Sequence, residues 1–281
     1  MPCVGGFSDF CVPYTTNHNE LLEIVETLIN FGYKSVAIEQ QFDHTVSEKS
    51  KFSKRTGDIF DAPVKLDFLD HLRGKIDIYS RLTIIYSDSA ISHHMGTSSN
   101  IKKYDLIAGL PTTEASLQHC CQTFNGDIIS FRVDEKYIKF SRKFYKLAVQ
   151  RNMFFEIQYS PAILDRSDRR CIIRKAHGFY SLGKSRNIII SSGATNAFHI
   201  RGPYDVANLG LIFGLSEEQS KNAMRSNCRS TILRAAGRRN GCTVVVVNKE
   251  INEDSESQSE ESETEEMNIV ETPCKKLKYS P

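Results

Sequence analysis

The feature that most constrains this chain is a regular alternation of short apolar, β-branched segments with longer amphipathic ones. Strands are predicted at 7–12, 35–40, 82–88, 104–110, 127–133, 154–160 and 187–192. Most intervening segments are long enough for a helix and a turn, and two late helices are predicted at 203–214 and 216–236. Strict alternation of strand and helix indicates parallel strands joined by right-handed crossovers.

Seven such strands can close into a barrel or form an open, doubly wound sheet. None is followed by G-x-G-x-x-G, which disfavours the dinucleotide-binding version of the open sheet. We therefore predict one α/β, TIM-like barrel over residues 1–248, and we expect functional residues at the carboxyl ends of its strands. Residues 41–75 are polar and rich in turn residues, which predicts an irregular insertion.

Two of the helices carry capping signals at their first turns. Asn17 with Glu20 three residues later resembles a capping box for a helix over 17–31. Ser216 and Gln219 form the corresponding box of the last helix, which Gly237 is expected to end.

Charge is distributed unevenly along the chain. The net charge is only +2, but residues 249–281 hold ten acidic and four basic side chains, which leaves 32 basic against 24 acidic, a net of +8, in 1–248. A basic body favours a polyanionic partner. The tail 249–281 is Ser/Glu-rich without apolar periodicity and is predicted to be disordered. Within it, PCKKLK (273–278) is either a weak nuclear import signal or a solvated basic cluster.

Compartment signals are few. The eight cysteines include no C-x-x-C pair and no zinc-finger spacing, which favours free thiols in a reducing compartment. No run approaches the ~18 apolar residues that a membrane span needs, so no membrane contact is predicted. Residues 1–12 do not have the pattern of a secretory signal.

Metal-dependent hydrolysis on a barrel needs histidines and carboxylates that converge at strand ends. The first strand offers Asp9 and Cys11 but no histidine, and there is no nucleophile elbow or phosphate-binding loop. We therefore predict no catalytic residue and no protein-bound metal or other cofactor. A metal-dependent phosphoesterase remains an alternative. The scattered candidate ligands are Asp43, His44, Asp88, His93 and His94.

Basic side chains recur at four-residue spacing, so that they share one face of each predicted helix. Like charges at this spacing repel by a few tenths of a kcal/mol per pair, a cost that a bound phosphate offsets. Several rows in one basic body favour a polynucleotide bound through its backbone and shape, whereas a single row is more simply a solvated face. The rows are Arg166, Arg170 and Arg174, flanked by Arg169; Lys221, Arg225 and Arg229; and Lys136, Lys139, Arg142, Lys143, Lys146 and Arg151.

Four stretches carry a closer likeness. They are SRLTIIYSD (80–88), FEIQYSPAI (155–163), IIISSGA (188–194) and IRGPYDVANLGLIFGLSE (200–217). Together they resemble the family of thirty-kilodalton protein subunits of eukaryotic nuclear ribonuclease P and ribonuclease MRP. The resemblance extends from about residue 7 to residue 236, weakens in the insertion and is absent from the tail.

This resemblance implies a seven-stranded barrel of the polymerase-and-histidinol-phosphatase (PHP) type without the full metal-ligand set. It implies a non-catalytic subunit of ribonuclease P, in which the RNA removes the 5′ leader of precursor tRNA and Mg²⁺ belongs to that RNA. The expected partners are ribonuclease P RNA, MRP RNA (in rRNA processing), precursor tRNA indirectly, and other protein subunits, including small RRM-like ones. The expected location is the nucleus and nucleolus. A scaffold that touches proteins but no RNA is a further alternative.

The resemblance also gives weight to particular basic residues. Those within or beside the matching stretches are preferred as RNA contacts, and they are Arg81, Arg169, Arg170, Lys184 and Arg201. Arg201 precedes the start of helix 203–214, which is a natural anion site. Its alternative role is a local salt bridge with Asp205, which would be of small value.

Overall fold

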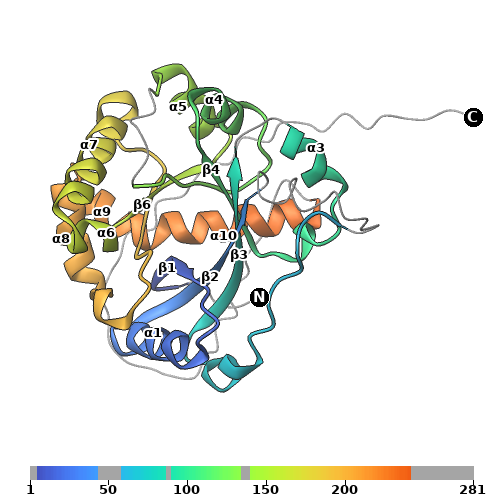
Figure 1. The fold of residues 1–281 in the computed structure, drawn as a ribbon. Coiled ribbons are helices and arrows are strands. Elements are labelled where there is room, and N and C mark those ends of the chain that lie inside the picture. Colours follow the sequence, from blue (N-terminus) through green and yellow to red (C-terminus); the bar gives the residue numbers. More distant parts are fainter. Residues whose placement is uncertain (1–4, 44–57, 87–89, 134–139, 242–281) are drawn as a thin grey trace, which may run out of the picture. The chain divides into compact units, whose positions relative to one another are not determined.

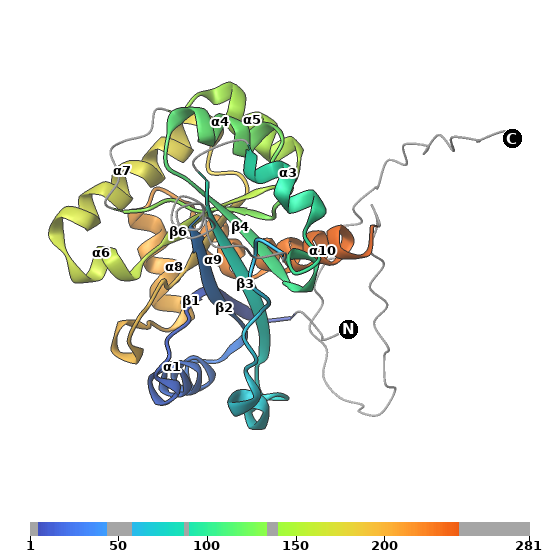
Figure 2. The ribbon, with the colours of Figure 1, turned by 45° about the vertical axis from the view of Figure 1, so that its right-hand side comes forward.

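The computed structural model describes residues 5–43, 58–86, 90–133 and 140–241, and these contain a seven-stranded parallel sheet whose strands follow one another in sequence order (Figures 1 and 2). The strands are β1 (Phe7–Pro13), β2 (Tyr33–Asp43), β3 (Asp77–Tyr86), β4 (Leu106–Pro111), β5 (Ile128–Ile129), β6 (Phe154–Gln158) and β7 (Ile188–Ser191). This confirms the predicted α/β, TIM-like barrel. The predicted tail 249–281 lies outside the described residues.

The barrel is nearly closed between its first and last strands. No ladder joins β7 to β1 in the described residues, but the chain beyond β7 reaches back to β1. Gly193 donates its N–H to the Cys11 carbonyl at 2.8 Å, and Ser192 donates its N–H to Asp9 Oδ1 at 3.0 Å. These bonds satisfy backbone groups at the seam.

Helices surround the strands on the outside of the barrel (Figure 1). In chain order, the helices are α1 (His18–Asn30), η1 (Asp67–Leu72), α3 (Ala90–Thr97), η2 (Ile101–Lys103), α4 (Glu114–Gln122), α5 (Arg142–Gln150), α6 (Ser160–Leu164), α7 (Arg166–Gly183), η3 (Ala197–His199), α8 (Pro203–Ile212), α9 (Glu217–Met224) and α10 (Ser226–Asn240). Their apolar faces pack on strands that are buried on both sides, as expected for parallel sheets.

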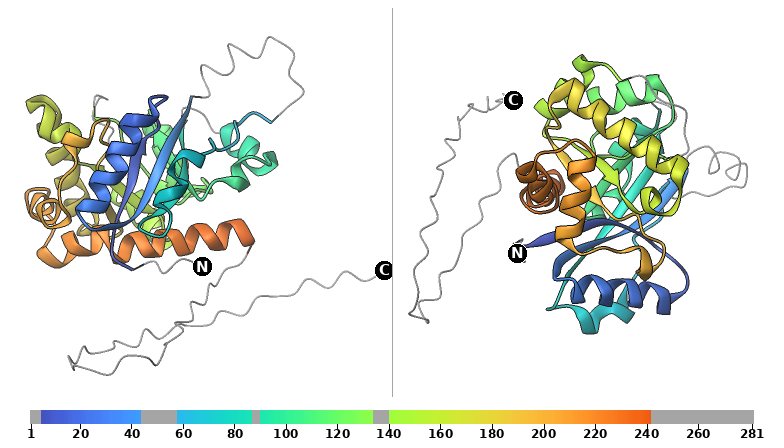
Figure 3. Two further views of the ribbon diagram at one scale, coloured as in Figure 1. Left: turned by 90° about the horizontal axis from the view of Figure 1, so that it is seen from below. Right: turned by 90° about the vertical axis from the view of Figure 1, so that its left-hand side faces the viewer.

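Helix α10 lies across one end of the strands, as both views in Figure 3 show. Its buried side chains Cys228, Ile232 and Ala235 form one apolar cluster with residues near the amino ends of the strands, among them Leu106 and Phe154. Burial of this layer favours folding by about 25 cal/mol per Å² of apolar surface. The last long helix therefore forms the floor of the barrel.

The structure corrects several predicted boundaries. The Asn17 side chain makes no capping hydrogen bond, so the first capping box is wrong, whereas the Ser216–Gln219 box is confirmed. The helix predicted over 216–236 is two helices, because the backbone turns at Arg225 (φ −122°, ψ −83°). Gly237 is buried within α10, which ends instead at Gly241 in the left-handed region.

The predicted insertion 41–75 is partly regular. Strand β2 continues to Asp43, and η1 places Leu69 and Leu72 in the core. Phe60 is almost fully buried and packs on Phe42, with ring centroids 4.7 Å apart. Residues 44–57 of the insertion lie outside the described part of the chain.

Candidate nucleic-acid interface and barrel interior

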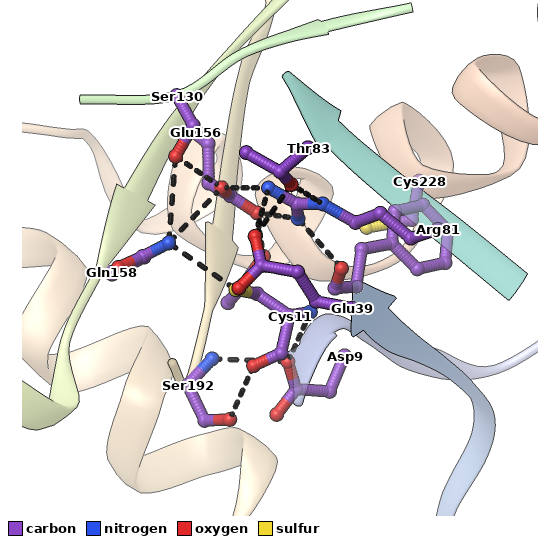
Figure 4. A network of polar contacts seen from close by, with 12 residues as sticks. Asp9, Cys11, Glu39, Arg81, Thr83, Ser130, Glu156, Gln158, Ser192 and Cys228 are labelled. Atoms are coloured by element: carbon purple, nitrogen blue, oxygen red, sulfur yellow. Dashed lines mark hydrogen bonds and ion pairs between the residues drawn. The ribbon is translucent and has the colours of Figure 1, made fainter. Parts of the chain in front are cut away.

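Arg81 lies in the middle of β3 and points into the barrel, where its side chain is fully buried (Figure 4). Its guanidinium donates two parallel hydrogen bonds to Glu156 of β6, at 2.5 and 2.7 Å, and lies 3.3 Å from a Glu39 oxygen. It also donates to the Phe10 carbonyl at 2.6 Å and to Thr83 Oγ1 at 3.1 Å. The prediction that Arg81 contacts RNA is therefore wrong, because no RNA can reach it.

Hydroxyl groups complete this interior network. Ser130 and Ser191 each donate to a Glu156 oxygen, at 2.7 and 2.8 Å, and Thr83 donates to Glu39 at 2.5 Å. Burial alone would raise the pKa of Glu156, but the Arg81 guanidinium reverses this and lowers it below its usual value. The buried pair is therefore ionised and fully hydrogen-bonded.

Asp9 of β1 lies at the edge of the same network. Its Oδ1 accepts hydrogen bonds from the N–H groups of Cys11 and Ser192, whereas Oδ2 is buried and has no partner among the residues that the structure describes. Burial raises the pKa of Asp9 to about 6. Burial likewise raises the pKa of the Cys11 thiol well above its usual value, so this cysteine is a neutral thiol.

The predicted metal ligands that the structure describes do not converge on one site. Within the described residues, no group of three or more His, Cys, Asp or Glu side chains is arranged to hold a metal ion. His93 and His94 lie side by side on α3, with ring centroids 6.0 Å apart and planes at 63°. His44 and Asp88 lie outside the described residues.

The predicted basic row lies on the exposed face of α7. Arg166, Arg170 and Arg174 are exposed, and their side chains have no hydrogen bond or ion pair within the described chain. Arg169 instead turns toward α6, where its guanidinium donates to the carbonyls of Ala162 and Ile163 at 2.6 and 3.2 Å. Arg169 therefore caps the end of α6, and the other three arginines remain available to a ligand.

Arg201 is only partly available. Its guanidinium donates two 2.8 Å hydrogen bonds to the carbonyls of Phe198 and Ile200, and it packs over the Phe198 ring at 5.9 Å. No ion pair with Asp205 forms, so the alternative role as a partner of this carboxylate is wrong. The side chain stabilises the turn that leads into α8 rather than extending toward the start of that helix.

The predicted row Lys221, Arg225 and Arg229 is divided by the bend at Arg225. Lys221 lies on α9 and pairs with Glu217 at 2.8 Å, whereas Arg229 lies on α10. Arg225 and Arg229 are both exposed beside this bend. The expected single stripe is wrong, because it assumed one continuous helix.

Sequence reasoning missed the role of the α10 arginines. Arg238 binds the fully buried Asp127 with its Nη2 at 2.9 Å from Oδ2, and Arg239 pairs with Asp105 at 2.6 Å. Arg234 donates to the Gly126 carbonyl at 2.9 Å. These bonds hold α10 against the loops that precede β4 and β5, so these arginines stabilise the fold.

Lys184 follows α7 and borders a cleft between this helix and α5. The cleft encloses about 440 Å³ and is lined by four basic side chains. Two of them, Lys184 and Arg186, come from the short connection to β7. The sequence offered Lys184 as a candidate but gave no signal for Arg186, since the connection has no periodic pattern.

Fold and surface together define an α/β-barrel protein with an ion-paired interior and basic side chains exposed on its outer helices. The chain belongs to the family of RNase P subunit p30, whose model matches residues 6–240. It is 34% identical over 244 residues to ribonuclease P protein subunit p30 of Mus musculus, a match that covers 86% of this chain and 90% of the relative.

A second relative agrees with this assignment, and a solved structure agrees with the fold. Ribonuclease P/MRP protein subunit RPP1 of Saccharomyces cerevisiae is 26% identical over 208 residues, which cover 73% of this chain and 69% of the relative. A chain in the cryo-EM structure of archaeal ribonuclease P with mature tRNA superposes with a TM-score of 0.60 at 14% identity, over 89% of this chain and 100% of that one. At that identity the structural likeness supports the barrel fold alone.

Among the described residues, no helix has the length and apolar character that crossing a bilayer requires.

Proposed function

We propose that this protein is a subunit of ribonuclease P, where it supports the catalytic RNA in removing the 5′ leader of precursor tRNA, and that it is shared with ribonuclease MRP in rRNA processing. The observation that carries this proposal is the family match over residues 6–240, which spans nearly the whole described barrel. The relatives named for ribonuclease P and for P/MRP support both roles.

The proposed role is non-catalytic. The interior carboxylates of Glu39 and Glu156 already contact the Arg81 guanidinium, so they are engaged within the protein. Exposed cations lie instead on the outer surface, among them Arg166, Arg170 and Arg174 of α7, whose side chains have no partner within the described residues. Such cations bind phosphates and release counterions, which stabilises a folded RNA without any chemical step by the protein. Mg²⁺ would be held by the RNA.

The proposed partners are ribonuclease P RNA, MRP RNA and other protein subunits of these particles, including small RRM-like ones, with precursor tRNA bound indirectly. The proposed location is the nucleus and nucleolus, where these RNAs act. The net charge of +8 over residues 1–248 suits a partner with a dense negative charge.

The test is to tag the protein, purify its native complex, sequence the bound RNA and assay cleavage of precursor tRNA before and after nuclease treatment. We expect ribonuclease P RNA in the complex and 5′-leader cleavage that nuclease abolishes. Cleavage that survives complete removal of RNA, together with stoichiometric Mn²⁺ or Zn²⁺ in the purified protein, would instead indicate a metal-dependent phosphoesterase. A complex without RNA would indicate a scaffold.

A further inference from the structure

A cleft lies between α5 and the carboxyl end of α7. It encloses about 440 Å³, and none of the described side chains that line it is acidic. Four of them are cationic, and all four are exposed. They are Arg142, Lys146, Lys184 and Arg186.

The backbone around this cleft is held firmly in place. Tyr145 Oη donates to the Arg186 carbonyl at 2.5 Å, and Gln219 Nε2 donates to the Lys184 carbonyl at 3.0 Å. The Tyr145 ring stacks on Phe155, with centroids 4.7 Å apart and planes 11° apart. Gly183 lets α7 approach this ring, because a Cβ there would lie 2.0 Å from Tyr145 Cε1.

The connection from α7 to β7 is also strained. Lys184, Ser185 and Asn187 all adopt positive φ, at 57°, 54° and 54°. Non-glycine residues rarely occupy this region, at a cost of about 1 kcal/mol or more each. This conformation keeps Lys184 and Arg186 on the border of one cleft, with their side chains exposed to solvent.

The cleft continues the basic row of α7. At about 100° per residue, Arg166, Arg170 and Arg174 fall within a sector of about 80° on this helix, and Lys184 directly follows its last residue. An 18-residue helix is about 27 Å long. The cations are spread along that length and lead to a cleft in which no described lining side chain is acidic. This arrangement suits an extended polyanion better than a small anion, because a small anion would contact only part of it.

We propose that the cleft between α5 and α7 binds the sugar–phosphate backbone of RNA, with Lys146, Lys184 and Arg186 as phosphate contacts and the α7 row as its continuation. This rests on the proposed function, because it names the surface through which the subunit holds its RNA. Four neighbouring cations without an acid repel one another, and bound phosphates offset that repulsion.

The test compares the full-length Lys184→Glu/Arg186→Glu variant with Lys65→Glu/Lys75→Glu, which changes the charge equally. Lys65 and Lys75 are exposed in the β2–β3 connection. The probe is labelled ribonuclease P RNA transcribed in vitro, titrated over a range of salt concentrations. We expect at least a tenfold loss of affinity at 0.1 M salt for the cleft variant. Its slope of log K against log salt should fall by about 1.8, at about 0.9 per lost phosphate contact.

The control should change affinity less than twofold. Equal losses of RNA affinity in the cleft variant and the control would contradict the assignment of the cleft as an RNA site, since they would reflect net charge alone. Charge reversal could lower the unfolding temperature of the first variant, so Lys146→Gln/Arg186→Gln serves as a second one. Its affinity for the RNA should fall at least threefold. Unchanged RNA affinity, even with loss of another subunit from the purified particle, would also overturn the cleft as an RNA site.

The two proposals fail in different ways. If the cleft variant binds RNA normally while the native complex still contains ribonuclease P RNA, the cleft is wrong and the proposed function stands. A native wild-type complex without RNA contradicts the proposed function and the cleft together.

Discussion

Arg81 shows how a charged side chain can belong to the core. Its guanidinium makes two parallel hydrogen bonds to Glu156, and the remaining donors reach Thr83, Glu39 and a backbone carbonyl. A buried ion pair can be close to neutral in net stability, but removing one partner leaves an uncompensated charge. The stability of the barrel therefore depends on keeping the three charges together.

We predict that Arg81→Met lowers the free energy of unfolding by about 3–5 kcal/mol, because Glu39 and Glu156 would remain buried without a cation. Urea unfolding at pH 7 measures the change. Arg170→Met is the matched control on an exposed helix face, where a change within about 0.5 kcal/mol is expected. Similar midpoints for the two variants would show that the network contributes little.

Asp9 gives a second prediction at this scale, and it concerns pH. Its pKa is about 6 in the folded state against 3.8 unfolded, so the unfolded chain loses this proton first as pH rises. Stability is therefore lost between pH 4 and pH 6, by up to about 3 kcal/mol at 1.36 kcal/mol per unit. The Asp9→Asn variant lacks this loss.

We expect Asp9→Asn to gain up to about 3 kcal/mol relative to wild type when the comparison moves from pH 4 to pH 7. Chemical unfolding of both proteins at the two pH values gives this difference. Any effect of the amide on the free energy of unfolding that does not depend on pH is the same at both values and cancels. A difference that does not depend on pH would mean that Asp9 is ionised in the folded protein.

The sequence held a signal for this interior network that RNA-contact reasoning missed. Glu39, Arg81 and Glu156 each lie within an apolar segment predicted as a strand or directly beside one. Strands of a parallel barrel are buried on both faces, so a charge there needs an opposite charge nearby. The place of Arg81 in a matching stretch favours an RNA contact, whereas its place beside a buried strand favours an interior ion pair, and the structure shows the latter.

At the scale of elements, two arginines that are adjacent in the sequence of α7 have different surroundings, because one faces α6 and the other faces solvent. Arg169 caps α6 through the carbonyls of Ala162 and Ile163, whereas Arg170 is exposed without a partner in the described chain. A change of about 100° per residue around the helix places them on different sides. Their substitutions should therefore have different effects.

We predict that Arg170→Ala/Arg174→Ala lowers the salt slope of RNA binding by about 1.8, at about 0.9 per phosphate contact, without changing thermal stability. Arg169→Ala should instead lower the unfolding temperature, because the carbonyls at the end of α6 lose their donor. Binding isotherms and thermal melts on both variants check this. A flattened salt slope for Arg169→Ala at unchanged stability would reverse the assignment.

Elements with strong local patterns were predictable from the sequence. Continuous apolar runs gave the strands, although β5 pairs over only Ile128 and Ile129 of the predicted 127–133. The break between α9 and α10 was not predictable, because no proline or glycine marks Arg225. The bend comes from packing instead: α9 packs against β7, and α10 turns to cover the barrel floor.

For the molecule as a whole, the four-residue spacing of the sequence predicted the basic rows. It could not predict which of the basic side chains are free to bind a ligand. Arg234, Arg238 and Arg239 are as basic as the α7 arginines, yet they hold α10 to buried or partly buried acceptors. Arg186 had no pattern at all and lies on the cleft only through tertiary structure. Net charge predicted the kind of partner, whereas the folded chain decides which cations can meet it.

The uneven charge of the whole chain leads to a last prediction. The segment 250–271 adds ten acidic residues to a body of net charge +8. These acids lower the attraction of the whole chain for RNA, since fields from the two parts partly cancel. A full-length variant with all ten changed to the corresponding amides should bind ribonuclease P RNA several-fold more tightly at 50 mM salt.

The gain should disappear at 0.5 M salt, where the Debye length shrinks to about 4 Å and the distant acids are screened. Binding titrations at the two salt concentrations measure it, with a variant carrying five Ser/Thr→Ala changes in the same segment as the control for altered composition. A gain that persisted at high salt would point to a direct contact between the segment and the RNA-binding surface, because only short-range interactions survive such screening.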